Sequence, residues 1–152
     1  MLNVYLMGVG SREPGAERQG HGALLPAPRS LYLLDLPGYG YSRASQTERR
    51  AFRLLITHAI ARPRLVGVLW LLDLRREPSP DDHAMHELFA ERETRVLAAL
   101  TKSDKLSHTE RQPRERALRE SLGLEDDQVI ATSARLGEGI EDLRESLRRL
   151  VG

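Results

Sequence analysis

The amino-acid sequence predicts a three-layer α/β fold, in which helices cover both faces of a doubly wound, mostly parallel sheet. Short and almost continuous apolar runs recur along the chain, and such runs are typical of strands that are buried on both faces. Helical patterns separate the runs, and strands that alternate with helices form parallel sheets with right-handed crossovers. A chain of 152 residues is long enough for one such domain.

The predicted strands are the apolar runs. They cover residues 2–9, 31–36, 65–72, 96–100 and 129–131. The segment between the first two runs, residues 10–30, is rich in Gly, Pro, Arg and Glu and shows no period. We therefore expect a flexible insertion there, within a single domain that spans residues 1–152.

Four helices are predicted from capping signals and apolar spacing. Ser45, followed three residues later by a glutamate, is typical of a capping box at the start of the first helix. Ser79 caps the second helix, and we interpret Asp82 as a residue of that cap rather than a ligand. The third helix covers residues 114–122 and ends at a glycine. The fourth covers residues 138–150.

The composition excludes several classes of protein. The chain is 40% hydrophobic and 30% charged with a net charge of +1, which argues against disorder, a coiled coil and a strongly basic nucleic-acid binder. It has no cysteine, so disulfide frameworks and thiolate metal sites are excluded. No apolar stretch approaches the roughly 20 residues that cross a bilayer. We expect a cytoplasmic monomer with no membrane partner.

Polar residues end the last four predicted strands, and ligands of open α/β sheets bind at the carboxyl ends of strands. One strand ends in Asp35-Leu36-Pro37-Gly38, another in Thr101-Lys102-Ser103-Asp104, and the last in Thr132-Ser133-Ala134. The strand between the first two of these ends in Asp73-Leu74-Arg75, to which we assign no role. Each pattern is weak alone, but their order on successive strand ends points to one ligand site.

The chemistry of these residues fits a guanine nucleotide. The carboxylate of Asp104 can accept hydrogen bonds from the N1 proton and the 2-amino group of guanine, whereas adenine offers neither donor in that arrangement. Lys102 would lay its aliphatic stem along the purine face, and the backbone amides after Ser133 would meet the guanine carbonyl.

At the phosphate end, Asp35 suits an outer-shell contact to Mg²⁺. The amide of Gly38 can reach a γ-phosphate because glycine has no side chain in the way. A carboxylate beside such a turn can register whether the third phosphate is present, as nucleotide switches do. The alternative is that Asp35 is only a turn or capping residue.

These residues resemble a known family. The motifs DLPG, TKSD and TSA are similar to the third, fourth and fifth guanine-nucleotide motifs of the P-loop GTPases. LDLPGYGYS and LLDLRREPSPDDHAM further resemble the EngB-type GTPases, and the resemblance covers residues 2–9 and 31–152. By resemblance the implied nucleotide-binding residues are Asp35, Pro37, Gly38, Thr101, Lys102, Asp104, Thr132, Ser133 and Ala134.

The resemblance implies GTP and GDP as ligands and Mg²⁺, with Asp35 at the metal and no catalytic side chain. It also implies Mg²⁺-dependent GTP hydrolysis, a role in assembly of the large ribosomal subunit, and a link to normal cell-division septation. The arginine-rich surfaces could then meet ribosomal RNA phosphates. The alternative is that they are ordinary solvated faces.

The chain departs from the family pattern in one respect. The phosphate loop G-x-x-x-x-G-K-[ST] cannot be written in it, because neither lysine, Lys102 or Lys105, follows a glycine. We therefore expect nucleotide binding weaker than about millimolar and no useful hydrolysis.

In the family the first strand lies in the middle of the sheet, so we expect a chain that lacks the first strand and helix and has a central gap of unpaired backbone groups. A misplaced start codon or a gene fragment would explain this. The alternative is a pseudo-GTPase, a non-hydrolysing interaction module that docks on a ribosome or another protein.

Overall fold

The computed structural model describes residues 2–10, 30–39 and 45–151, and it confirms the α/β fold. The predicted insertion at residues 10–30 lies almost wholly outside the described residues. Five strands form one sheet in the order β2-β1-β3-β4-β5. They are β1 (Leu2–Gly10), β2 (Ser30–Tyr39), β3 (Leu65–Asp73), β4 (Val96–Thr101) and β5 (Val129–Ala131).

The strands run mostly in one direction. β3 pairs with β4 and β4 with β5 in parallel, while β1 is antiparallel to both of its neighbours, β2 and β3. β2 therefore points the same way as β3, β4 and β5, and only β1 runs against them. The carboxyl ends of those four strands face one edge of the sheet.

The predicted central gap is wrong. β1 lies between β2 and β3 and pairs with both along most of its length, for example through Tyr5, which is level with Asp35 on one side and Leu69 on the other. Backbone N–H and C=O groups inside a sheet are costly to leave without partners, and a nine-residue strand is long enough to satisfy both neighbours.

The end predicted for the second strand, at Leu36, is also wrong, because β2 continues to Tyr39. Val4 pairs with Leu36 and Leu2 pairs with Tyr39, so β2 has one more residue than β1 over this stretch. That difference is a β-bulge next to Pro37. A proline, which has no backbone N–H, is tolerated at a bulge of an edge strand such as β2.

The helices confirm the capping signals. They are α1 (Gln46–Ile60), α2 (Pro80–Glu91), α3 (His108–Leu122) and α4 (Ile140–Val151). Ser45 and Ser79 each form a capping box, and the backbone N–H of Ser79 donates to Oδ2 of Asp82 at 2.6 Å. The interpretation of Asp82 as a cap residue is confirmed. α3 begins six residues earlier than predicted because it continues across Pro113.

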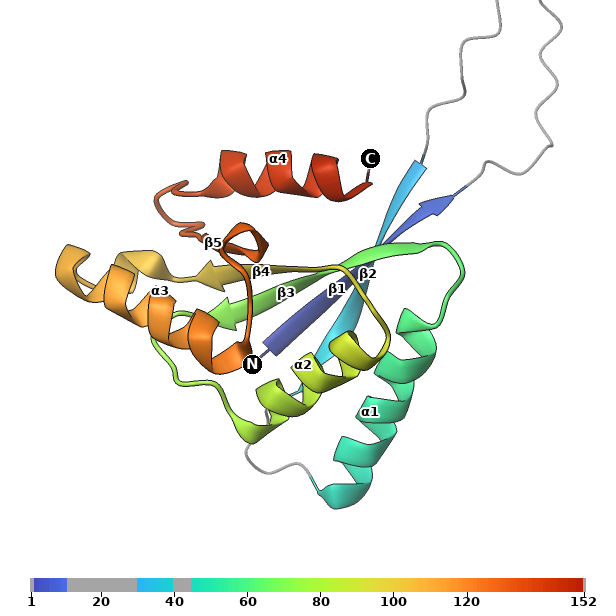
Figure 1. Cartoon of the computed structure of the whole chain (residues 1–152). Helices are drawn as coiled ribbons and strands as arrows, with labels where there is room; N and C mark the ends of the chain where they lie inside the picture. Colours follow the sequence, from blue (N-terminus) through green and yellow to red (C-terminus); the bar gives the residue numbers. More distant parts are fainter. Residues whose placement is uncertain (1, 11–29, 40–44, 152) are drawn as a thin grey trace, which may run out of the picture.

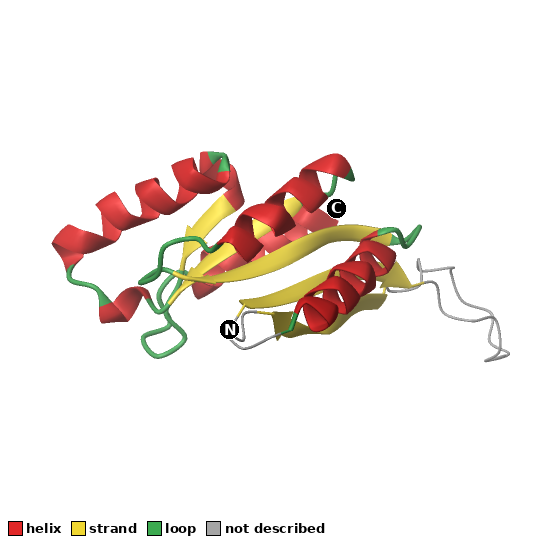
Figure 2. Cartoon of the chain, turned by 90° about the horizontal axis from the view of Figure 1, so that it is seen from below, coloured by secondary structure: helices red, strands yellow, loops and turns green. Residues whose placement is uncertain are grey.

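The helices form a layer on each side of the sheet, with α1, α2 and α3 on one face and α4 on the other (Figures 1 and 2). The larger core lies under the three helices and includes Trp70 of β3, whose ring meets Phe89 of α2 edge-on with centroids 5.5 Å apart. The smaller core lies under α4 and joins Leu69 and Leu97 to Leu147. Neither helix layer covers the carboxyl ends of β3 and β4, where the loops that follow these strands begin.

Two glycines before α4 allow a matched test of how this helix is joined to β5. Gly137 and Gly139 both have positive φ, 75° and 68°. A Cβ at Gly137 would meet nothing, whereas one at Gly139 would collide with the backbone carbonyl of Ala131. We expect Gly137→Ala to lower the free energy of unfolding by about 1–2 kcal/mol, and Gly139→Ala to lower it by at least a further ~1–3 kcal/mol. Urea unfolding of both variants measures this, and equal losses would contradict the described junction.

Candidate functional site

The loops after β4 and β5 meet at the carboxyl edge of the sheet. Ser133 Oγ donates to Oδ1 of Asp104 at 2.7 Å, and the backbone N–H of Ser103 donates to the carbonyl of Thr132 at 3.1 Å. Asp104 belongs to a short 3₁₀ helix, η1 (Ser103–Lys105). The structure thus brings together the two motifs that the sequence assigned to the guanine base.

The β5 loop is held by its own backbone. Ser133 is fully buried, and its N–H donates to the carbonyl of Glu138 at 3.0 Å while its Oγ accepts from the N–H of Leu136 at 3.2 Å. Thr132 is also buried, and its N–H donates to the carbonyl of Leu100 in β4 at 2.8 Å. Ala134 follows on the exposed outside of this loop. The loop is therefore preorganised by contacts that need no ligand.

Asp104 is covered by cations. Arg135 Nε donates to its Oδ2 at 2.8 Å, Lys105 Nζ lies 3.9 Å from the same oxygen, and the Asp104 side chain is only 5% exposed. The hydrogen bond from Arg135, followed by that from Ser133, lowers the pKa of Asp104. The carboxylate is therefore ionised at neutral pH, and Arg135 must move before a ligand can use Oδ2. Sequence reasoning missed Arg135, although it follows Ser133 by two residues.

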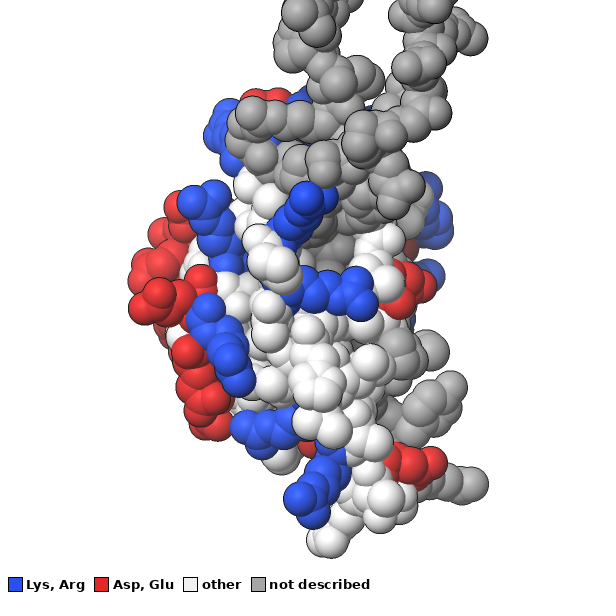
Figure 3. All heavy atoms as spheres, turned by 90° about the vertical axis from the view of Figure 1, so that its right-hand side faces the viewer, with Lys and Arg blue, Asp and Glu red and all other residues white. Residues whose placement is uncertain are grey.

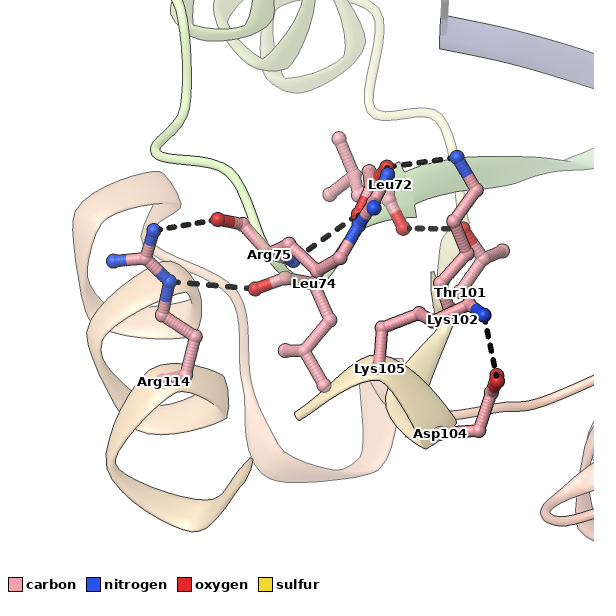
Figure 4. Close-up of polar contacts among 9 residues, drawn as sticks. Leu72, Leu74, Arg75, Thr101, Lys102, Asp104, Lys105 and Arg114 are labelled. Carbon is pink, nitrogen blue, oxygen red and sulfur yellow. Dashed lines mark hydrogen bonds and ion pairs between the residues drawn. The ribbon is translucent and has the colours of Figure 1, made fainter. Parts of the chain in front are cut away.

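Lys102 is held by the neighbouring strand end. Its backbone is left-handed, with φ of 65°, and its Nζ donates to Oδ2 of Asp73 at 2.8 Å (Figure 4). Arg75 binds the same carboxylate through Nε at 2.8 Å and Nη2 at 2.7 Å. The hydrogen bond from Arg75 is the largest cause that lowers the pKa of Asp73, and Lys102 adds to it. Asp73 was singled out in the sequence without a role.

Thr101 joins the same two strand ends. Its Oγ1 donates to the carbonyl of Leu72 at 3.0 Å, and its own carbonyl accepts from the N–H of Leu74 at 3.1 Å (Figure 4). These bonds continue the contact between β3 and β4 beyond the paired residues Asp73 and Thr101. These two hydrogen bonds fix the backbone at Thr101, the residue directly before Lys102.

The predicted phosphate-end residues lie apart from this cluster. Asp35 is exposed and is level with Leu97 through the registers of β1 and β3. Because Leu97 lies four residues before Thr101 in β4, Asp35 is set back from the level of Thr101 by about 13 Å along the strand direction. Pro37 and Gly38 continue β2 toward the shared edge. Within the described residues, no hydrogen bond or ion pair joins Asp35 to the loops after β4 and β5.

The described residues fit Mg²⁺ only in part. Mg²⁺ is commonly held by one or two carboxylates together with water and substrate phosphates, and Asp35 is a single exposed carboxylate. Among the described residues, no group of three or more His, Cys, Asp or Glu side chains could hold a metal ion. An ion at Asp35 would therefore need the phosphates of a bound nucleotide.

The fold and the loops define an α/β protein of the doubly wound class, with the candidate site residues at or near the carboxyl edge of the sheet. A crystal structure of a probable GTP-binding protein EngB has the same fold, with a TM-score of 0.64 at 20% identity, over 76% of this chain and 73% of that one. None of the helices in the described part of the chain is long and apolar enough to span a bilayer.

Curated relatives narrow the class further. A probable GTP-binding protein EngB of Gemmatimonas aurantiaca is 37% identical over 142 residues, which is 93% of this chain and 69% of the relative. Probable EngB proteins of Geobacillus sp. and Syntrophomonas wolfei are each 35% identical, and the chain spans 64% and 62% of their lengths. No model of a known protein family matches the sequence. The chain belongs to the EngB family.

The Asp73 cluster should make stability depend on acid pH. A carboxylate whose pKa is lowered by folding stabilises the protein above its unfolded pKa of about 3.9, and this contribution is lost as pH falls through the folded value. We expect Asp73→Asn to lower the free energy of unfolding by about 2–3 kcal/mol at pH 7, and by progressively less below about pH 4. Urea unfolding between these pH values measures the difference.

The matched control is Asp127→Asn, an exposed aspartate in the short helix η2 (Asp126–Gln128). It should change stability little at any pH. A stability loss from Asp73→Asn that is the same at pH 7 and pH 2.5 would contradict the ion-pair account.

Proposed function

We propose that this chain binds a guanine nucleotide at the meeting point of the loops after β4 and β5. The observation that carries the proposal is the contact of Asp104 with Ser133. It places a carboxylate, which can read guanine, against a loop whose backbone amides can meet the guanine carbonyl. Membership of the EngB family, whose curated members are named probable GTP-binding proteins, supports the same ligand.

In this proposal Thr101, Thr132 and Ala134 shape the base pocket, and the stem of Lys102 lies along the purine face. Asp35, Pro37 and Gly38 serve the phosphates, with Asp35 near Mg²⁺. The activity we propose by family is Mg²⁺-dependent hydrolysis of GTP to GDP and phosphate, with no side chain as general base. The chain spans about two thirds of the relatives' length, so this activity is proposed for the family's complete domain.

We further propose the large ribosomal subunit as partner, in its assembly and in normal septation. Basic side chains, coloured blue, spread over the face seen in Figure 3, while most acidic side chains on view gather along its left margin. At the amino ends of β3 and β4, Arg62, Arg92 and Arg95 line a cavity of about 430 Å³. Guanidinium groups of this kind bind RNA phosphates. This surface lies opposite the nucleotide edge, so both could be occupied together.

A non-hydrolysing interaction module is the second candidate. The observation that favours it is that no glycine directly precedes Lys102 or Lys105, which leaves the given sequence without a phosphate-loop lysine. Hydrolysis assays on this chain, and on a version that carries any in-frame residues encoded upstream of Met1, separate the two candidates. Hydrolysis by the longer version alone would support the GTPase proposal.

Asp104→Asn tests the base site. An amide in place of the carboxylate can donate to the 2-carbonyl of xanthine, but it opposes the 2-amino donor of guanine. We expect the wild type to prefer guanosine over xanthosine monophosphate by about tenfold or more, and the variant to reverse that preference. NMR titrations at millimolar nucleotide measure both affinities, with Asp127→Asn as control. An unchanged preference would remove Asp104 from the base site.

A further inference from the structure

The Asp73 carboxylate, at the end of β3, accepts more hydrogen bonds than are needed to form a turn. Arg75 supplies a bidentate pair to the carboxylate, and the backbone N–H of Arg75 donates to its Oδ1 at 3.1 Å. These bonds are local and would close the turn by themselves. The additional bond from Lys102 Nζ comes from the loop after β4, 29 residues further along the chain. The Asp73 side chain is only 11% exposed, so Lys102 meets a carboxylate that is largely screened from water.

The hydrogen bond to Asp73 fixes the conformation of the Lys102 side chain. A lysine stem has four rotatable carbons and is mobile unless its ammonium group is held. Here the left-handed backbone of Lys102 sends the chain off the end of β4, and Asp73 receives its Nζ at the end of β3. The stem therefore spans the two strand ends.

The type of residue supports a specific role at this position. Lys102 and Lys105 are the only lysines among the 23 basic Lys and Arg residues of the chain, and both lie in the loop after β4. A lysine combines a slender aliphatic stem with a compact charge, whereas a guanidinium group is planar and broad. A surface that only needed positive charge would carry arginine here, as it does elsewhere in this chain.

The loop that carries Asp73 is itself anchored to α3. Arg114 donates from Nε to the carbonyl of Leu74 at 3.3 Å and from Nη2 to the carbonyl of Arg75 at 2.9 Å (Figure 4). Arg114 also forms an ion pair with Glu77. A continuous series of contacts thus runs from α3 through the loop after β3 to Asp73 and Lys102.

We propose that Asp73 is a positioning residue for purine recognition, which holds the stem of Lys102 where the face of a guanine base would lie. The inference rests on the proposed guanine site. Asp73 does not touch the base in this account, and it acts only through Lys102. Arg114 acts one step further back by fixing the loop that carries Asp73. The role belongs to the strand end Asp73-Leu74-Arg75, which the guanine motifs leave without a function.

The two lysines make the test direct. Lysine labelled with ¹³C at the ε-carbon gives two signals in the whole chain, from Lys102 and Lys105. The 152-residue chain and its Asp73→Asn and Asp73→Glu variants are titrated with guanosine and adenosine monophosphates, with Asp127→Asn as the matched control. Backbone amide spectra of β4 report whether each variant is folded.

We expect the wild-type Lys102 signal to respond to guanosine monophosphate and much less to the adenosine nucleotide. Asp73→Asn should move the free Lys102 signal toward that of an unrestrained lysine and weaken guanine binding about five- to tenfold. Asp73→Glu, which keeps the charge, should retain part of the affinity and serves as the test if Asp73→Asn does not fold. The control should behave as the wild type.

Two results would contradict different claims. If Asp73→Asn binds guanosine monophosphate with wild-type affinity, the role of Asp73 is overturned and the guanine site stands. The same result for Asp73→Glu decides the question where only that variant folds. A wild-type chain with no guanine preference at Lys102 or at the amides of the β5 loop overturns the guanine site itself, and the role of Asp73 with it.

Discussion

The hydrogen bond from Ser133 to Asp104 is the interaction on which the site depends. It joins the loops after β4 and β5 through a buried hydroxyl and an almost fully covered carboxylate. Removing either partner would leave a polar group without its bond, which is costly inside a protein. In the proposed site this pair would set where a base is recognised, and Arg135 makes a second contact with Asp104. The two loops are joined without a ligand, and Arg135 has to move before a ligand can use Oδ2 of Asp104.

The sheet determines what else can reach this site. Since β1 runs against its neighbours, β2 keeps the direction of β3 and β4, and all three present their carboxyl ends to one edge. This arrangement is compatible with base recognition at one end and phosphate recognition at the other. The register nevertheless places Asp35 in the interior of β2 and four residues short of Thr101. In this structure the loops after β4 and β5 are joined, whereas no hydrogen bond or ion pair among the described residues joins Asp35 to them.

Local signals in the sequence were sufficient for most elements. The apolar runs predicted all five strands, and the cap residues Ser45 and Ser79 predicted two helix starts. These features depend on residues close together in the chain. The place of β1 in the sheet and the length of β2 depend on pairing between distant segments, so they were missed. The same holds for the contact of Lys102 with Asp73 and of Arg135 with Asp104, which join residues 29 and 31 positions apart. Sequence patterns indicate which residue types form a site. The tertiary contacts decide which of these side chains are already bound to another residue.

The most direct measurement is a crystal structure of this chain with guanosine monophosphate. The account predicts the base against Asp104, with N1 and the 2-amino group within hydrogen-bond distance of the carboxylate, the stem of Lys102 along the ring, and Arg135 displaced from Oδ2. A nucleotide bound elsewhere on the molecule, with the contact between Arg135 and Asp104 intact, would contradict it.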